Sequence, residues 1–142
     1  MSIIKKGSAI YHSLGKKGKA NVSTESGALS DQPYGFNTRF EDKAGTNPEE
    51  LIAAAHASCF TMALSFALEG EGYKEGQLQT EAAVSLDKDG DGFTVTKSAL
   101  TLEAEVADIE ANEFERIAQT AKANCPISKL LDTEITLEYT LK

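Results

Sequence analysis

The stretch NPEELIAAAHASCFTMALSFALEG, residues 47–70, decides the fold because it predicts one long and unusually apolar helix. Asn47 is a good N-cap, Pro48 suits the first helical position, and two acidic residues follow where the helix dipole is positive. We expect the helix to continue to about Glu69, where two nearby glycines end it.

This helix is apolar on nearly every face. Residues 51–68 contain no charged side chain. The length of this uncharged run is at the lower limit for a membrane-spanning helix. The run is mostly alanine with Ser, Thr and His interspersed, and it lacks flanking basic residues and aromatic belts, so we expect no membrane span. A monomer of 142 residues has little room to cover such a helix, and we expect a second copy of the chain to cover part of it.

Alternating apolar residues predict strands on both sides of this helix. The short strands are expected at residues 8–13, 19–24 and 37–41, and the longer ones at 78–86, 93–106 and 133–141. The apolar phase shifts within the 93–106 strand, which predicts a bulge near Lys97 or Ser98.

A second helix is expected between the last two long strands, with Asp108 as its cap and its end near Asn124. Pro126 disfavours helical geometry at Cys125 but suits the first position of a new helix, so Cys125 is predicted to cap a short helix through Leu131. Together these elements predict a single α+β domain over residues 1–142, with helices packed on antiparallel sheet.

The composition of the chain disfavours several classes of function. The formal charge of −8 disfavours nucleic acid and anionic membranes as partners, because both select for basic patches. The N-terminal residues lack the apolar segment of a signal peptide, so the cytoplasm is the expected location. Two cysteines in a chain of this size favour a catalytic or incidental role over a disulfide framework.

Cys59 and Cys125 are the candidate reactive residues. Cys59 lies on the face of the long helix that carries Met62 and Phe66, where a cysteine can also serve as a small core side chain. Cys125 is expected at a helix N-terminus, where the helix dipole favours a thiolate, although it too could be a structural cap.

Arg39 is conspicuous because the chain has only one other arginine, Arg116. A fixed positive charge about 4 Å from a thiol, at an effective dielectric near 20, favours the thiolate by about 4 kcal/mol, or roughly three pKa units. Glu49, in the first turn of the long helix, could hold the guanidinium in a bidentate pair. Both residues could equally be solvated surface charges.

His56 precedes Cys59 by one helical turn, a spacing at which a Cys-His nucleophile could form. The same pattern permits metal ligation, but zinc takes three or four ligands and His12 is the only other histidine, so no metal site is expected. Residues 87–92, DKDGDG, imitate the start of a calcium loop, yet the twelfth position is Ser98, and a hairpin turn is expected instead.

Several segments of the chain together resemble the OsmC family of osmotically inducible proteins. The organic hydroperoxide resistance proteins are the sister branch of this family. The matching segments are VSTESG (22–27), PYGFNTRFE (33–41), GTNPEELI (45–52), AAHASCF (54–60) and ANCPIS (123–128).

This resemblance implies an OsmC-like fold, an intertwined homodimer with active sites at the subunit interface, and no cofactor. It implies that Cys59 attacks a hydroperoxide and that Cys125 resolves the product, with Arg39 stabilising the Cys59 thiolate and Glu49 orienting Arg39. The implied substrates are organic hydroperoxides and, more weakly, hydrogen peroxide. The implied reductant is a dithiol, with a lipoylated protein as one candidate.

Two other functions stay open at the level of sequence. One is a Cys-His acyl hydrolase that uses Cys59 and His56, which would also need an oxyanion hole. The other is a dimeric stress or binding protein without enzymatic activity, in which both cysteines are inert.

Overall fold

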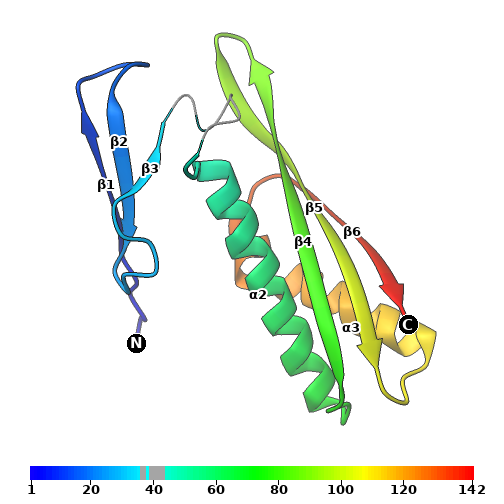
Figure 1. The fold of residues 1–142 in the computed structure, drawn as a ribbon. Helices are drawn as coiled ribbons and strands as arrows, with labels where there is room; N and C mark the ends of the chain where they lie inside the picture. The colour runs from blue at the N-terminus through cyan, green and yellow to red at the C-terminus, as the bar shows by residue number, and fades with distance from the viewer. Residues whose placement is uncertain (36–37, 39–43) are drawn as a thin grey trace. The chain divides into compact units, whose positions relative to one another are not determined.

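The computed structural model describes residues 1–35, 38 and 44–142 of the chain. They fall into two compact units, Met1–Leu51 and Ile52–Lys142, and each unit has a three-stranded sheet of its own (Figure 1). The strand predicted at residues 37–41 lies outside the described residues, apart from Thr38.

The first unit holds an antiparallel sheet of β1 (Gly7–His12), β2 (Lys19–Thr24) and β3 (Gln32–Tyr34), in that order. The first two strands were predicted to within a residue at each end. β3 was not predicted, because it is only three residues long and contains a proline, which is depleted in strands.

The long helix α2 (Pro48–Gly70) forms as predicted. The side-chain Oδ1 of Asn47 accepts a hydrogen bond of 2.8 Å from the Glu50 N–H, which satisfies one of the free donors at the helix start. At the other end the chain turns at Gly72, whose φ of +97° is in the left-handed region, and the Tyr73 N–H donates to the Leu68 carbonyl at 2.9 Å.

The second unit contains a sheet of β4 (Gly76–Asp89), β5 (Gly92–Val106) and β6 (Glu134–Leu141), in that order. β4 and β5 form an antiparallel hairpin whose turn includes Gly90, at a φ of +59°, which confirms the hairpin turn predicted for residues 87–92. The register shifts by one residue opposite Ser85 and Leu86, so the predicted bulge falls next to Lys97.

Two features of the second unit differ from the sequence prediction. β6 runs parallel to β5, because the chain between them crosses over through α3 (Ala111–Asn124) and α4 (Pro126–Leu130). Asp108 does not cap α3: it adopts a left-handed φ of +68°, and Glu110 occupies the N-cap position instead.

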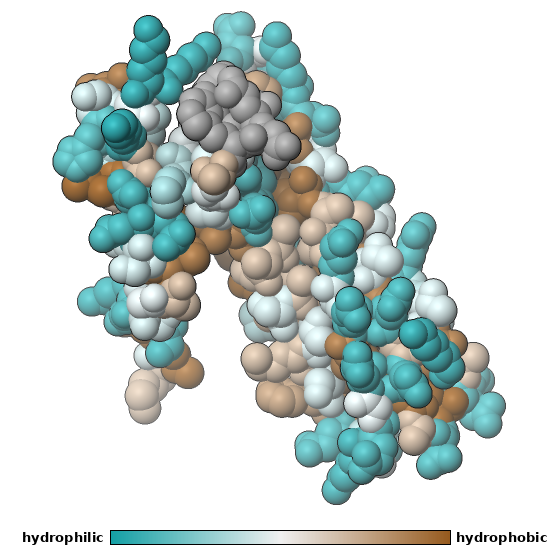
Figure 2. All heavy atoms as spheres, viewed as in Figure 1, coloured by the Kyte–Doolittle hydropathy of each residue, from teal (hydrophilic) through white to brown (hydrophobic). Residues whose placement is uncertain are grey.

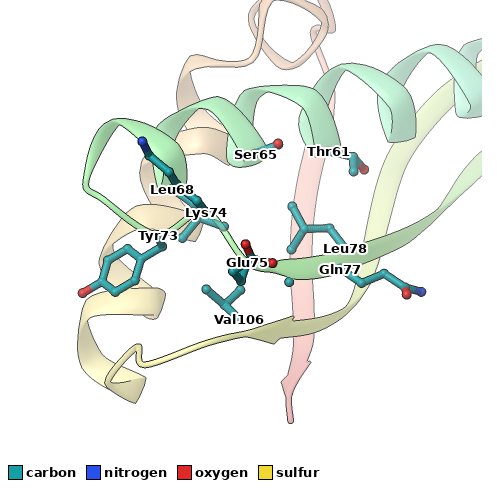
Figure 3. Close-up of a pocket in the computed structure, with 10 residues that line it drawn as sticks. Thr61, Ser65, Leu68, Tyr73, Lys74, Glu75, Gln77, Leu78 and Val106 are labelled. Atoms are coloured by element: carbon teal, nitrogen blue, oxygen red, sulfur yellow. The ribbon is translucent and has the colours of Figure 1, made fainter.

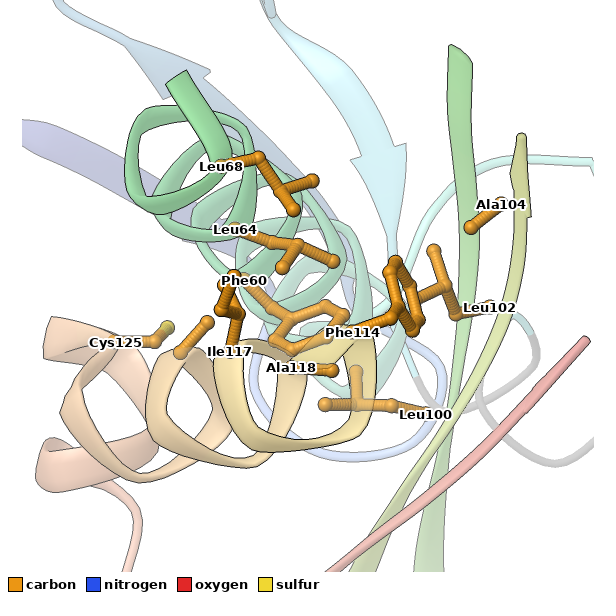
Figure 4. Close-up of a cluster of buried hydrophobic side chains, with 11 residues drawn as sticks. Phe60, Leu64, Leu68, Leu100, Leu102, Ala104, Phe114, Ile117, Ala118 and Cys125 are labelled. Atoms are coloured by element: carbon orange, nitrogen blue, oxygen red, sulfur yellow. The ribbon is translucent and has the colours of Figure 1, made fainter. Parts of the chain in front are cut away.

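The core of the second unit lies between α2, α3 and one face of β5. Phe60 of α2 and Phe114 of α3 are completely buried, and Leu100 and Leu102 of β5 face them (Figure 4). Truncating a buried phenylalanine to alanine typically costs about 3–5 kcal/mol, so these contacts account for much of what fixes α2 on the sheet. The positions that line this face are residues 98, 100, 102 and 104, which alternate along β5 as a strand with one buried face requires.

The other side of α2 is left uncovered in the second unit. Met62 is 57% and Phe66 is 67% exposed, and with Ala54, Ala55 and Ser58 they form what we call the outer stripe of α2. Figure 2 shows apolar side chains along this helix. Among the described residues α2 is also the one helix long and apolar enough to cross a membrane, with a mean hydropathy of 1.7, although its inner side packs as a core helix does.

Candidate active site

Cys59 lies in the middle of α2, at the border between the buried and the exposed sides of the helix. It is partly exposed and packs against the core. Its contact with the core agrees with a cysteine in apolar packing, but Met62 and Phe66, which were assigned to the same face of the helix, are largely exposed. The thiol is therefore close to both the core and the outer stripe.

Cys125 lies where α3 ends and α4 begins, as Pro126 predicted. Its N–H donates to the Ala121 carbonyl at 2.9 Å and closes α3, and the same residue is the N-cap of α4, with Pro126 at the first helical position. Its side chain is 0% exposed and belongs to the hydrophobic core. The buried sulfur of Cys125 thus lies between α3 and α4, at the N-terminus of α4.

The two cysteines affect each other's ionisation although they are 66 positions apart in the sequence. Both cysteines are free, and Cys125 acts to raise the pKa of Cys59 while Cys59 acts to lower the pKa of Cys125. Two thiols near enough to do this ionise as a pair, and only one of them carries a negative charge at a time.

Within the described residues the charge is favoured on Cys125. Burial acts to raise the pKa of Cys125, but the hydrogen bond from Cys59 and the N–H and hydroxyl of Ser128 outweigh it, and the pKa is lowered. Burial raises the pKa of Cys59, and the hydrogen bond that it donates to Cys125 raises it further, against a smaller opposing effect of the Ile127 N–H. Another group is needed if Cys59 is to become the thiolate.

Arg39, the group predicted for that task, lies outside the described residues. Glu49 is in the first turn of α2, the same helix that carries Cys59. The pairing of Arg39 with Cys59 and with Glu49 stays a prediction.

His56 is completely buried, and both of its ring nitrogens are hydrogen-bonded to serines. Nδ1 lies 2.6 Å from the Ser98 hydroxyl of β5, and Nε2 lies 2.8 Å from the Ser128 hydroxyl of α4. Burial lowers the pKa of His56, so the ring is neutral at pH 7. Because neither nitrogen is left over to accept a proton from Cys59, this geometry does not support the Cys-His acyl hydrolase.

The convergence of these two serines on His56 was not predicted. Ser98 and Ser128 are 42 and 72 positions away from His56, and neither belongs to a local motif with it. The phase shift near Ser98 was the one available signal, because it moves Ser98 onto the buried face of β5.

A pocket of about 240 Å³ lies away from the cysteines, at the C-terminal half of α2 (Figure 3). Its lining includes Thr61, Ser65, Tyr73 and Lys74, and it contains neither cysteine nor His56. Within residues 1–35, 38 and 44–142, no group of three or more His, Cys, Asp or Glu side chains is placed to hold a metal ion.

Comparisons with known proteins cover the chain from end to end. The sequence model of the OsmC-like protein family matches residues 40–140. The chain is 56% identical over 142 residues to Peroxiredoxin OsmC of Escherichia coli strain K12, which covers 100% of this chain and 99% of that protein. It is 25% identical over 123 residues to the organic hydroperoxide resistance protein OhrB of Bacillus subtilis strain 168, with 86% and 88% of the two chains covered.

The fold is shared with solved structures as well. The crystal structure of OhrB from Bacillus subtilis superposes with a TM-score of 0.69 and 29% identity, over 99% of this chain and 98% of that one. A family match over most of the chain, together with 56% identity to a full-length relative, leaves one assignment. The chain belongs to the OsmC family.

Proposed function

We propose that this protein is a thiol peroxidase that reduces organic hydroperoxides with Cys59 and Cys125. The observation that carries the proposal is that the two free cysteines lie near enough for each to change the pKa of the other, because a resolving thiol must reach the oxidised sulfur without a large movement. The names of its relatives, a peroxiredoxin and organic hydroperoxide resistance proteins, support the same reaction.

The reaction consists of two displacements at sulfur. The Cys59 thiolate attacks the terminal peroxide oxygen, the O–O bond breaks, and the alkoxide leaves and takes a proton to become an alcohol, so Cys59 is left as a sulfenic acid. The Cys125 thiolate then attacks the Cys59 sulfur, an S–S bond forms, and hydroxide leaves and is protonated to water. A dithiol supplies two electrons by exchange and returns both cysteines to thiols.

Arg39 supplies the charge that moves the anion from Cys125 to Cys59, and Glu49 orients Arg39. What supports this role is that the described residues raise the pKa of Cys59 and lower the pKa of Cys125, so a further group is needed to favour the anion on Cys59. A guanidinium about 4 Å from Cys59 favours the anion on Cys59 by about 4 kcal/mol at an effective dielectric of 20.

The preferred substrates carry an apolar group next to the peroxide. Cys59 is partly exposed beside the outer stripe of α2, where Met62 and Phe66 offer apolar contacts to an alkyl or aryl group. Hydrogen peroxide lacks such a group and is reduced more weakly.

The working form is an intertwined homodimer, in which the outer stripe of α2 is covered by the second subunit. The exposure of Met62 and Phe66 supports this, because a contiguous exposed apolar strip marks an interaction surface. Both units of the chain then belong to one OsmC-like domain over residues 1–142, and the family match across residues 40–140 spans the division between them.

The cytoplasm suits this cycle, because its thiol pools keep free cysteines reduced. The reductant is a dithiol, since its second thiol can release the mixed disulfide that the first one forms with the enzyme. A lipoylated protein meets this requirement.

The test is a comparison of wild type, Cys59→Ser and Cys125→Ser in dithiol-dependent consumption of cumene hydroperoxide. We expect wild type to turn over, Cys59→Ser to form no sulfenic acid, and Cys125→Ser to form a sulfenic acid that reacts with dimedone and is oxidised further by excess peroxide. Hydrolysis of an activated ester that survives in Cys125→Ser would favour the hydrolase instead, and absence of any peroxide consumption by wild type would favour the inert stress protein.

Arg39 is tested in the same assay with Arg39→Ala and Arg39→Lys. We expect Arg39→Ala to slow sulfenic acid formation at pH 7 by a factor of roughly a hundred to a thousand, as a loss of up to about three pKa units of thiolate stabilisation requires, and to slow it less at pH 9. Arg39→Lys keeps the charge and should fall between the two. Equal rates of sulfenic acid formation in all three proteins would exclude Arg39 from activation.

A further inference from the structure

The buried imidazole of His56 connects two serines to the reactive pair of cysteines. It is 0% exposed, it bonds to Ser98 through Nδ1 at 2.6 Å, and it bonds to Ser128 through Nε2 at 2.8 Å. The thiol chemistry described above gives it no task. A buried polar group that is fully hydrogen-bonded from three separate elements, α2, β5 and α4, fixes those elements relative to one another.

A neutral imidazole has one N–H donor and one acceptor nitrogen. The two serines must therefore play opposite parts: one donates its hydroxyl proton to the ring, and the other accepts the ring proton. The position of that proton on the ring decides which serine has its own hydroxyl proton left for a third partner.

Cys125 is the candidate third partner of Ser128. Cys125 is the N-cap of α4 and Ser128 is its third helical residue, so the two side chains begin one turn apart on the same short helix, and the Cys125 sulfur makes no capping hydrogen bond of its own. The hydroxyl and the N–H of Ser128 both act to lower the pKa of Cys125 against the effect of burial.

Only one tautomer of His56 leaves Ser128 able to donate to the sulfur. With the proton on Nε2, the ring donates to the Ser128 oxygen, the Ser98 hydroxyl donates to Nδ1, and the Ser128 hydroxyl proton is free to point at Cys125. With the proton on Nδ1, Ser128 must donate to the ring and offers the sulfur only lone pairs, which suits a protonated thiol.

We propose that His56 is a positioning residue for the resolving step, which directs the Ser128 hydroxyl at Cys125 through its Nε2 proton. The inference rests on the proposed peroxidase cycle. Once Cys59 has become a sulfenic acid, Cys125 must be a thiolate to attack it, and the relay from Ser98 through His56 and Ser128 keeps it in that form. In the attack the S–S bond forms, the S–O bond of Cys59 breaks, and hydroxide leaves to be protonated from solvent.

The first test measures the pKa of Cys125 in a Cys59→Ser protein, in which Cys125 is the only remaining cysteine. The Cβ chemical shift of ¹³C-labelled cysteine, followed against pH, reports its ionisation even though the side chain is buried. The informative pair of variants is His56→Gln, whose amide reaches the position of Nε2 and can donate to Ser128, and His56→Asn, whose shorter amide reaches only the position of Nδ1.

We expect His56→Asn and Ser128→Ala each to raise the pKa of Cys125 by about one unit, a tenfold loss of thiolate relative to thiol, while His56→Gln leaves it nearly unchanged. The double variant His56→Asn/Ser128→Ala should show no further rise, because both changes remove the same hydrogen bond. Ser58→Ala is the matched control: its exposed hydroxyl donates to the Ala55 carbonyl at 3.1 Å, and no shift is expected.

A purely structural role for His56 predicts a different result, in which Asn and Gln lower the melting temperature alike and the pKa of Cys125 does not distinguish them. That result overturns the proposal, as does a pKa that responds to Ser128→Ala but not to His56→Asn.

The second test separates the relay from the peroxidase cycle itself. In proteins that keep both cysteines, one equivalent of cumene hydroperoxide is added and the sulfenic acid and disulfide are followed in time. We expect His56→Asn to form the sulfenic acid at the wild-type rate and the disulfide about tenfold more slowly, and His56→Gln to match wild type in both steps. Wild type that forms no sulfenic acid would overturn the proposed function, whereas equal disulfide rates in Asn and Gln variants would overturn the relay alone.

Discussion

At the scale of single residues, the protein pairs a buried imidazole with two serines, one at each ring nitrogen of His56. Burial makes these polar groups costly to leave unpaired, and each is paired. The side chains of the described residues leave no buried polar nitrogen or oxygen without a partner.

The pH dependence of stability follows from His56. Its pKa is lowered from 6.5 by burial, so below pH 6.5 the unfolded chain binds a proton that the folded chain does not. Stability is therefore complete above about pH 6.5 and falls as the pH drops from there toward the folded-state pKa, by at most about 1.4 kcal/mol per pH unit.

We expect denaturant unfolding of wild type to lose stability between pH 7.5 and 5.5, and His56→Gln to lose less over the same range, because glutamine does not titrate. Protein concentration is held fixed, since dimerisation would otherwise contribute. Parallel losses in the two proteins would show that His56 is not the group that titrates.

At the scale of elements, local signals decided which helices could be predicted. Asn47 before Pro48 fixes the start of α2, and Pro126 after Cys125 fixes the break between α3 and α4, because each acts through its own backbone and nearest neighbours. The cap at Asp108 was mispredicted because an aspartate tolerates left-handed backbone as readily as it caps a helix.

The start of α2 offers a direct measurement. Asn47→Ala removes the acceptor of the 2.8 Å bond from the Glu50 N–H and should cost about 1 kcal/mol in the free energy of unfolding. Asn47→Asp is the control, because it keeps the capping oxygen but cannot make the 3.1 Å bond that the Asn47 amide donates to the Thr38 carbonyl. If both variants lose the same stability, the second bond and not the cap is responsible.

At the scale of the whole molecule, the sequence predicts which side of a strand is buried better than it predicts which elements that strand lies beside. The alternation in the last strand identified its buried side, yet a period of two is the same in parallel and antiparallel pairing, so the parallel alignment of β5 and β6 could not be read from it. The same limit applies to the site: Cys59 and Cys125 could be named, but the meeting of His56 with Ser98 and Ser128 depends on the folded sheet and helices.

The assembly can be tested through the outer stripe of α2. Phe66→Lys places a charge on the surface that the second subunit is proposed to cover, and we expect it to weaken dimerisation by at least a hundredfold, about 3 kcal/mol, in sedimentation or light scattering across a dilution series. Thr101→Lys, which adds the same charge beside Glu81 and Glu138 on the opposite face of the sheet, should leave dimerisation unchanged. If Phe66→Lys also assembles normally, the stripe is not the interface.

The parallel pairing of the last strand affects the order in which a growing chain becomes protected. The β4–β5 hairpin can close once β5 has left the ribosome, but β6 must wait for the whole crossover through α3 and α4. Cys59 is thus synthesised 66 residues before Cys125, and in the proposed cycle it has no resolving thiol during that interval. The proposed cycle therefore predicts that synthesis under peroxide stress leaves a fraction of newly made molecules irreversibly oxidised at Cys59.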